Sequence, residues 1–249
     1  MQVLLRNPLA DPYILGISGG AAVGALSAIL LGFSGLWLTN AAFAGAIFSI
    51  VLVFGIANKF GKWSVTRLLL TGVVVSAGWG AVINILLTTT STNNVQSMLF
   101  WLMGDLSQSS VGSAHFLLLA IALLGGLYVS RSLNVLTRGE LVASALGVNV
   151  PTLRLILYFS ASVLTATAVT IAGSVGFVGL IIPHALRLLG ARDHRLLIPC
   201  SLLLGGSFLL LADTIARTVI APQQLPVGVV TAIIGVPAFV IILRRSMKN

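Results

Sequence analysis

Charged side chains are scarce in this sequence, since Asp, Glu, Lys and Arg together make up 8% of its 249 residues. Soluble globular proteins are about a quarter charged, and a chain so poor in charge cannot cover a water-exposed surface. Hydrophobic residues reach 57%, and the mean hydropathy is +1.08. The composition therefore excludes a soluble globular protein and predicts a polytopic membrane protein.

Acidic residues and cysteine are rarer still. Five Asp and Glu stand against fourteen Lys and Arg, which gives a formal net charge of +9. In a membrane protein this excess reflects basic residues in cytoplasmic loops, so we expect no nucleic acid partner. Cys200 is the only cysteine and the three histidines are scattered, which excludes an intrachain disulfide and predicts no metal site.

Long apolar runs predict an all-α transmembrane bundle of about eight spans, which we treat as one domain, residues 1–249. The runs cover about Tyr13–Phe33, Leu36–Ile56, Leu68–Leu87, Phe116–Tyr128, Leu153–Ala172, Leu180–Leu189, Leu196–Ala212 and Val227–Leu243. The first run is crowded with small residues, including Gly16, Gly19, Gly20 and Gly24. Small residues let helices approach closely in lipid, so this run is expected inside the bundle. A stretch at about 95–106 is too short to span and fits a re-entrant or surface helix.

The placement of basic residues predicts the orientation. With the N-terminus in the cytoplasm, all of the fourteen Lys and Arg residues except Arg217 fall on the inner side. The positive-inside rule therefore predicts the orientation of this multi-pass protein, which we expect in the bacterial cytoplasmic membrane. An even number of spans puts both termini in the cytoplasm.

The polar stretch Arg138–Pro151, RGELVASALGVNVP, stands between apolar runs on the predicted cytoplasmic side. Glu140, Ala143 and Gly147 are three and four residues apart, so in a helix they share one face. This pattern favours a short helix that docks on another protein. An ordinary helix at the membrane surface is the alternative.

The sequence contains no phosphate-binding loop. The nearest candidate, Gly55 to Trp63, has one residue too many and a Trp where Ser or Thr is needed to bind magnesium. We therefore expect no ATP hydrolysis by this chain. The run GSVGFVG, with Gly173, Gly176 and Gly179, predicts a tight turn before a span that Pro183 interrupts.

Ionisable residues are nearly absent from the predicted spans. His184 has no carboxylate at a usable spacing, so it favours a structural histidine over a catalytic one. Secondary transporters usually keep Asp, Glu or Lys in their spans for ion coupling. A solute pathway without such groups, beside a cytoplasmic docking helix, indicates energy supplied by a separate ATPase.

Five segments carry a resemblance to a known family. They are RNPLADPYILGISGGAAVGA (6–25), MLFWLMGDL (98–106), RGELVASALGV (138–148), GSVGFVGLIIPHALRLLGARDHRLLIP (173–199) and LPVGVVTAIIGVPAFVIIL (225–243). The chain resembles the FecCD family, the permease subunits of type II ABC importers for iron-siderophores, haem and vitamin B12. The match runs from Arg6 to the C-terminus, and GFVGLIIPH and NPLADP are its most specific motifs.

The resemblance implies a homodimeric or pseudo-dimeric permease with a pathway at the subunit interface. Its partners would be a second permease subunit, an outer substrate-binding protein and a cytoplasmic ATPase dimer that holds ATP and Mg, with no cofactor on this chain. The segment 138–151 corresponds to the ATPase-coupling loop, with Arg138, Gly139, Glu140, Ala143, Ser144 and Gly147. Arg217 corresponds to an arginine that meets the binding protein, while a pair with Asp213 is the plainer alternative. Pathway-lining residues would be Asn84, Thr88, Thr89, Thr90, Val227 and Val230.

One departure from the family concerns the start of the chain. Family members usually have ten helices, and the first two precede the NPLADP motif, whereas this chain begins there. We therefore expect a fragment, a truncated gene model or a subunit completed by a second chain. An iron-siderophore is the expected cargo, with haem and cobalamin open. An ion-coupled secondary transporter and a non-transporting membrane scaffold are the alternatives from other classes.

Overall fold

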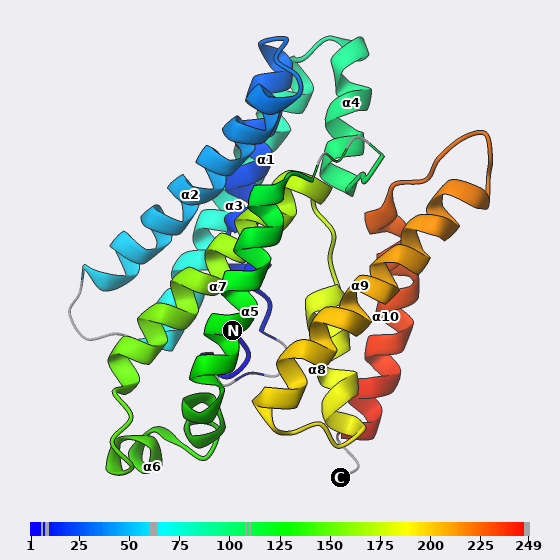
Figure 1. Cartoon of the computed structure of the whole chain (residues 1–249). Coiled ribbons are helices and arrows are strands. Elements are labelled where there is room, and N and C mark those ends of the chain that lie inside the picture. The colour runs from blue at the N-terminus through cyan, green and yellow to red at the C-terminus, as the bar shows by residue number, and fades with distance from the viewer. Residues whose placement is uncertain (6, 8–9, 60–63, 108, 110, 247–249) are drawn as a thin grey trace. The chain divides into compact units, whose positions relative to one another are not determined.

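The computed structural model describes all of residues 1–249 except 6, 8–9, 60–63, 108, 110 and 247–249 (Figure 1). The described chain is helical. Its elements are η1 (Pro12–Leu15), α1 (Ile17–Leu30), α2 (Leu36–Asn58), α3 (Val65–Thr89), α4 (Thr92–Met103), α5 (Ser113–Leu136), α6 (Glu140–Ala145), α7 (Val150–Ala172), α8 (Val178–Leu188), α9 (His194–Thr218) and α10 (Val227–Ser246).

These helices form two compact units. Unit 1 consists mainly of Asp11–Ser110 and Tyr158–Ser174, and it holds α1 to α4 with most of α7. Unit 2 consists of Gln2–Ala10, Val111–Leu157 and Val175–Asn249, and it holds α5, α6, the start of α7 and α8 to α10.

Every predicted span coincides with a helix, which confirms the all-helical class. In the described chain, five helices are long and apolar enough to cross a membrane: α2, α3, α5, α7 and α9. The shorter apolar helices are α1, α8 and α10. The stretch at about 95–106 forms α4, a helix of 12 residues. Pro183 does not interrupt α8, which continues through it from Val178 to Leu188.

Close packing of α1 against α2 organises unit 1. A Cβ atom added at Gly20 would lie 2.5 Å from the carbonyl oxygen of Gly45, and one added at Gly24 would overlap the carbonyl oxygen of Ala41. Glycine at these positions lets the two backbones touch, which is how helices associate in lipid. The prediction that the glycine-rich run lies inside the bundle agrees with the complete burial of Ile17 and Leu26.

A buried serine joins three elements of unit 1. The Ser49 hydroxyl of α2 donates a hydrogen bond to the Gly16 carbonyl oxygen at 2.8 Å, and it accepts one from the Trp79 indole N–H of α3 at 2.9 Å. Gly16 has a φ of 75°, so η1 ends there and α1 starts in a new direction. Asp11 caps η1, because its carboxylate accepts the Tyr13 backbone N–H at 2.9 Å.

Unit 2 is built around α5, α8, α9 and α10. The α8–α10 contact is close, since a Cβ atom added at Gly235 would lie 2.7 Å from the Cβ atom of Phe177. Asn134 of α5 fixes the start of α9. Its amide nitrogen donates to the Asp193 carboxylate at 2.7 Å, and its amide oxygen accepts the His194 backbone N–H at 2.9 Å.

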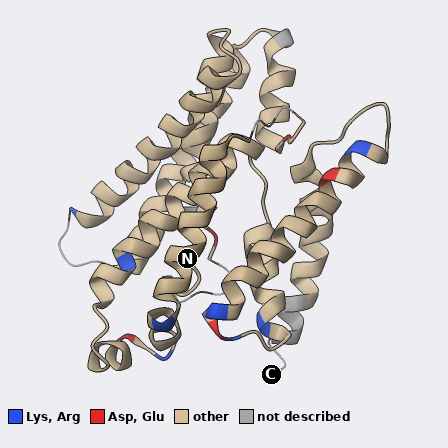
Figure 2. Ribbon diagram, viewed as in Figure 1, with Lys and Arg blue, Asp and Glu red and all other residues tan. Residues whose placement is uncertain are grey.

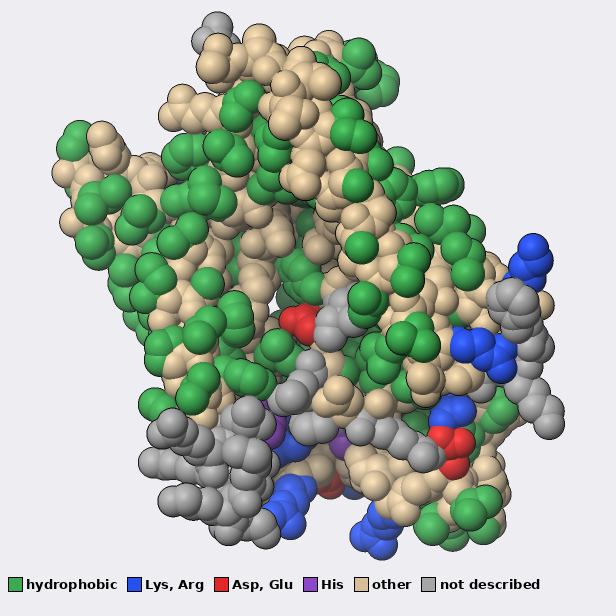
Figure 3. Space-filling view, turned by 180° about the vertical axis from the view of Figure 1, so that it is seen from behind, with side chains coloured by type: hydrophobic (Ala, Val, Ile, Leu, Met, Phe, Trp, Pro, Cys, Tyr) green, Lys and Arg blue, Asp and Glu red, His purple; other side chains and the backbone are tan. Residues whose placement is uncertain are grey.

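The surfaces of both units match a lipid environment. Lys, Arg, Asp and Glu lie near helix ends and in turns (Figure 2). Hydrophobic side chains cover much of the visible surface (Figure 3). On α5, for example, Phe116 is 65% exposed and Tyr128 is 88% exposed. Such faces are stable in lipid and would be costly in water.

Candidate functional site

The segment 138–151 folds as the predicted short helix, α6, between two glycines with left-handed backbone. Gly139 precedes the helix with a φ of 116°, and Gly147 follows it with a φ of 79°. The Gly147 N–H donates to the Ser144 carbonyl, and the Val148 N–H donates to the Ala143 carbonyl. These bonds form a glycine C-cap, so the sequence defines both ends of α6.

The face of α6 that carries Ala143 packs against its own chain. Ala143 is completely buried in a cluster with Leu136 of α5 and with Val150 and Leu153 of α7. Glu140 forms an ion pair with Arg154, four residues into α7. The prediction that Glu140 and Ala143 jointly face a partner therefore needs correction, because Ala143 has no surface left for one.

The opposite face of α6 is apolar and exposed. Leu141 is 88% exposed, Leu146 is 66% exposed and Val142 is 43% exposed. Ser144, Arg138 and Gly147 are also exposed. Burying these side chains against lipid or against a partner surface is favourable, because it removes them from water.

The predicted pathway residues separate into two groups. Asn84, Thr88 and Thr89 are exposed at the end of α3, and the Thr88 and Thr89 hydroxyls donate to carbonyls one turn earlier at 2.9 and 2.8 Å. Thr90 is half-buried and bonds the Leu86 carbonyl in the same way. These hydroxyl groups therefore have hydrogen-bond acceptors within α3 itself. The end of the helix needs no polar partner and can contact either an apolar or a polar surface.

Val227 and Val230 of α10 differ from this exposed group. Val227 is 1% exposed and Val230 is 5% exposed, so both side chains pack inside unit 2. The prediction that they line a pathway does not fit this packing. Among the described side chains of α10, the large hydrophobic ones that are exposed are Ile233, Ile234, Val236, Val240 and Ile241.

Arg217 lies in the last turn of α9. Its Nε atom is 2.8 Å from a carboxylate oxygen of Asp213, one turn earlier, and the two side chains are 40% and 21% exposed. The pairing that the sequence offered as an alternative is therefore present. The pair also orients the guanidinium.

The run GSVGFVG divides between a turn and a helix. Gly173 has a φ of 68°, and a Cβ atom added there would overlap the Trp101 carbonyl oxygen, so the close approach requires glycine. Gly176 lies in the turn, whereas Gly179 and Pro183 belong to α8. The predicted turn is therefore shorter than expected, and α8 starts at Val178.

Polar groups at the α8–α9 turn form a separate cluster in unit 2. The Arg195 backbone N–H and the Asn134 amide donate to Asp193, and these hydrogen bonds lower the pKa of that carboxyl. His184, for which the sequence favoured a structural role, is only 7% exposed. The described residues contain no group of three or more His, Cys, Asp or Glu side chains able to hold a metal ion.

Comparisons with known proteins agree with this architecture. A model of the FecCD transport family matches residues 1–245. The ABC transporter permease protein YvrB of Bacillus subtilis is 41% identical over 257 residues, covering all of this chain and 72% of YvrB. The cobalamin import system permease protein BtuC of Halobacterium salinarum is 44% identical over 248 residues, covering 98% of this chain and 66% of BtuC.

A solved structure of similar fold is a metal-chelate type ABC transporter in an inward-facing conformation. It matches with a TM-score of 0.90 and 34% identity, over 98% of this chain and 79% of that one. The chain thus spans 66% to 79% of the lengths of these three proteins.

Proposed function

Because the chain belongs to the FecCD transport family, we propose that it forms the membrane pathway of an ABC importer for a large metal chelate. A metal-chelate transporter and a cobalamin permease are among the proteins it resembles, which supports this class of cargo. Iron-siderophores, haem and cobalamin are all members of the class. We assign selection of the cargo to the outer binding protein.

The observation that carries the proposal is the geometry of α6. Its inner face is fixed twice, by Ala143 in the cluster with Leu136 and Leu153 and by the Glu140–Arg154 ion pair. Its outer face presents Leu141 and Leu146. A helix held in this way moves together with the start of α7, so a push on Leu141 is transmitted to a membrane-spanning helix.

We assign the push to a cytoplasmic ATPase dimer that binds ATP and Mg. The same assignment places both termini in the cytoplasm and Arg217 on the outer face, in accord with the positive-inside rule. There Arg217 would receive a carboxylate of the substrate-binding protein. A second permease subunit would complete the pathway, along which the exposed Asn84, Thr88 and Thr89 of α3 are the candidate lining residues.

The test is the substitution Leu141→Glu, with Leu189→Glu as its matched control. Leu189 lies just after α8, is 82% exposed and belongs to the same predicted side of the membrane, but it is outside α6. Burial of a leucine at an interface contributes about 1.5–3 kcal/mol. Leu141→Glu should therefore weaken co-purification with the ATPase by tenfold or more, since tenfold corresponds to about 1.4 kcal/mol.

Leu189→Glu should leave co-purification near the wild-type level. Equal retention of the ATPase by wild-type protein and Leu141→Glu would contradict the proposed docking surface. Thermal unfolding of both variants in detergent controls for misfolding. Neither side chain packs in a core, so their unfolding temperatures should stay close to wild type.

A further inference from the structure

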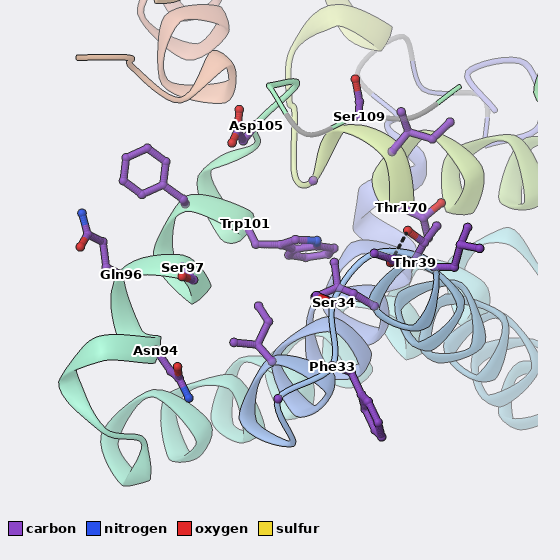
Figure 4. A pocket seen from close by; sticks show the side chains of 18 residues that line it. Phe33, Ser34, Thr39, Asn94, Gln96, Ser97, Trp101, Asp105, Ser109 and Thr170 are labelled. Atoms are coloured by element: carbon purple, nitrogen blue, oxygen red, sulfur yellow. Dashed lines mark hydrogen bonds between the residues drawn. The ribbon is translucent and has the colours of Figure 1, made fainter. Parts of the chain in front are cut away.

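Unit 1 contains a cavity of about 770 Å³ that the proposed transport function does not use. Its walls come from the α1–α2 turn, α4, the segment after α4 and the last turn of α7. In Figure 4, Trp101 extends from α4 toward Ser34 in the α1–α2 turn and Thr39 in α2, while Asp105 lies beyond the end of α4. The cavity therefore joins segments that are far apart in the sequence.

The cavity lies where spanning helices end. Among the candidate spans, α2 begins at Leu36 and α7 ends at Ala172, and residues beside both positions line the cavity. Phe33 in the α1–α2 turn and Trp37 at the start of α2 are 49% and 70% exposed, with ring centroids 6.1 Å apart. Exposed aromatic residues at the ends of spans lie at the level of lipid headgroups. A headgroup is the ligand available at that depth.

The Asp105 carboxylate favours binding of a cation on its side of the cavity. Of its described lining residues, only Asp105 is charged, and none is Lys, Arg or His. Asp105 is held in place, because its backbone N–H donates to the Ala172 carbonyl at 3.0 Å. Its two carboxylate oxygens accept from the Ser107 N–H and hydroxyl, each at 2.7 Å, and each keeps a further acceptor position. The indole of Trp101, which also lines the cavity, offers a face that attracts ammonium groups.

The start of α2 supplies backbone N–H groups, which can bind an anion. Gly35 is the N-cap of α2, it makes no side-chain cap hydrogen bond, and both Gly35 and Leu36 line the cavity. The first backbone N–H groups of a helix have no partner within it, and they favour a phosphate. The cavity thus pairs donors for an anion with a carboxylate and an aromatic ring for a cation.

We propose that this cavity binds the headgroup of an amine-bearing phospholipid, phosphatidylethanolamine. The ammonium group would lie between Asp105 and Trp101, and the phosphate at the N-terminus of α2. The inference rests on the chain lying in a membrane, and it is independent of the cargo and of the ATPase. A lipid bound here would tie the α1–α2 turn to α4.

Lipid retention by the purified full chain tests the proposal. The protein is exchanged into mixed micelles that contain equal amounts of phosphatidylethanolamine, phosphatidylcholine and phosphatidylglycerol with the same acyl chains, and bound lipid is counted by native mass spectrometry. We expect phosphatidylethanolamine to exceed phosphatidylglycerol about fivefold, in line with one cation–π contact. Asp105→Asn and Trp101→Leu should each remove most of that preference.

Trp37→Leu is the matched control, since Trp37 is an exposed tryptophan at the start of α2 that does not line the cavity. It should keep the wild-type preference. Equal retention of the two lipids by wild-type protein, or an unchanged preference in folded Asp105→Asn, would overturn the proposal. Competition by water-soluble phosphoethanolamine at the same concentration as the lipid would overturn the lipid assignment, because it would indicate a site for the free compound.

Discussion

Replacing Gly24 with alanine should force α1 and α2 apart. The added methyl group would overlap the carbonyl oxygen of Ala41, which is backbone and cannot rotate away as a side chain would. The helices must therefore separate by a few tenths of an ångström or more, and they lose contacts along their shared face. Gly20 meets the carbonyl oxygen of Gly45 in the same interface, so a shift at one position disturbs the other.

Two opposing effects determine the size of the change. Alanine favours a helix over glycine by about 0.5–1 kcal/mol. Overpacking of a close contact costs about 1–3 kcal/mol, and a backbone obstacle puts Gly24→Ala at the upper end of that range. The net loss should be about 2 kcal/mol. For a chain of this size that corresponds to a fall in Tm of about 4–8 °C.

The assay is thermal unfolding of the detergent-solubilised protein. The amount of folded protein that remains after heating is measured at each temperature. Gly55→Ala is the matched control, because Gly55 lies in α2 and a Cβ atom added there would have no neighbour within 4 Å. Its Tm should equal or exceed that of the wild type. If Gly24→Ala behaved like Gly55→Ala, the inferred backbone contact between α1 and α2 would be incorrect.

Two further predictions concern charged groups outside the spans. Arg217→Glu places a like charge beside Asp213 and should slow association of the substrate-binding protein, more strongly at low salt; equal association rates across a salt series would leave only the Asp213 pair. Burial raises the pKa of Asp11, so the folded chain holds that proton more tightly than the unfolded chain and stability falls as pH rises through the folded pKa. Asp11→Asn keeps an acceptor for the Tyr13 N–H, so it should weaken this fall in pH-dependent unfolding scans.

Hydropathy was enough to predict the apolar helices, because each one coincides with an apolar run bounded by turn residues. It was weaker at helix ends. The predicted fourth span stopped at Tyr128, whereas α5 continues to Leu136 through Ser130 and Asn134. Those polar side chains find partners inside unit 2, since Ser130 bonds the Leu127 carbonyl and Asn134 bonds Asp193. A transfer scale counts them as exposed to lipid, so it ends the helix too early.

The spacing of residues in α6 predicted a shared face but not its direction. Glu140 and Ala143 do lie on one side, yet Arg154 and the cluster around Leu153 cover that side. The cover comes from α7, and sequence spacing within one helix carries no information about it. The exposed Leu141 was missed for the same reason. The sequence did contain a signal for Leu141, because a leucine in a short polar surface segment indicates a contact surface.

The measurement that tests the account most directly is uptake of a labelled metal chelate into vesicles that contain the chain in its complete transport assembly. The account predicts uptake that requires ATP hydrolysis, persists after ion gradients are collapsed, and falls at least tenfold with Leu141→Glu but not with Leu189→Glu. Uptake that follows an ion gradient and continues without the ATPase would contradict it, and would make the chain a secondary transporter.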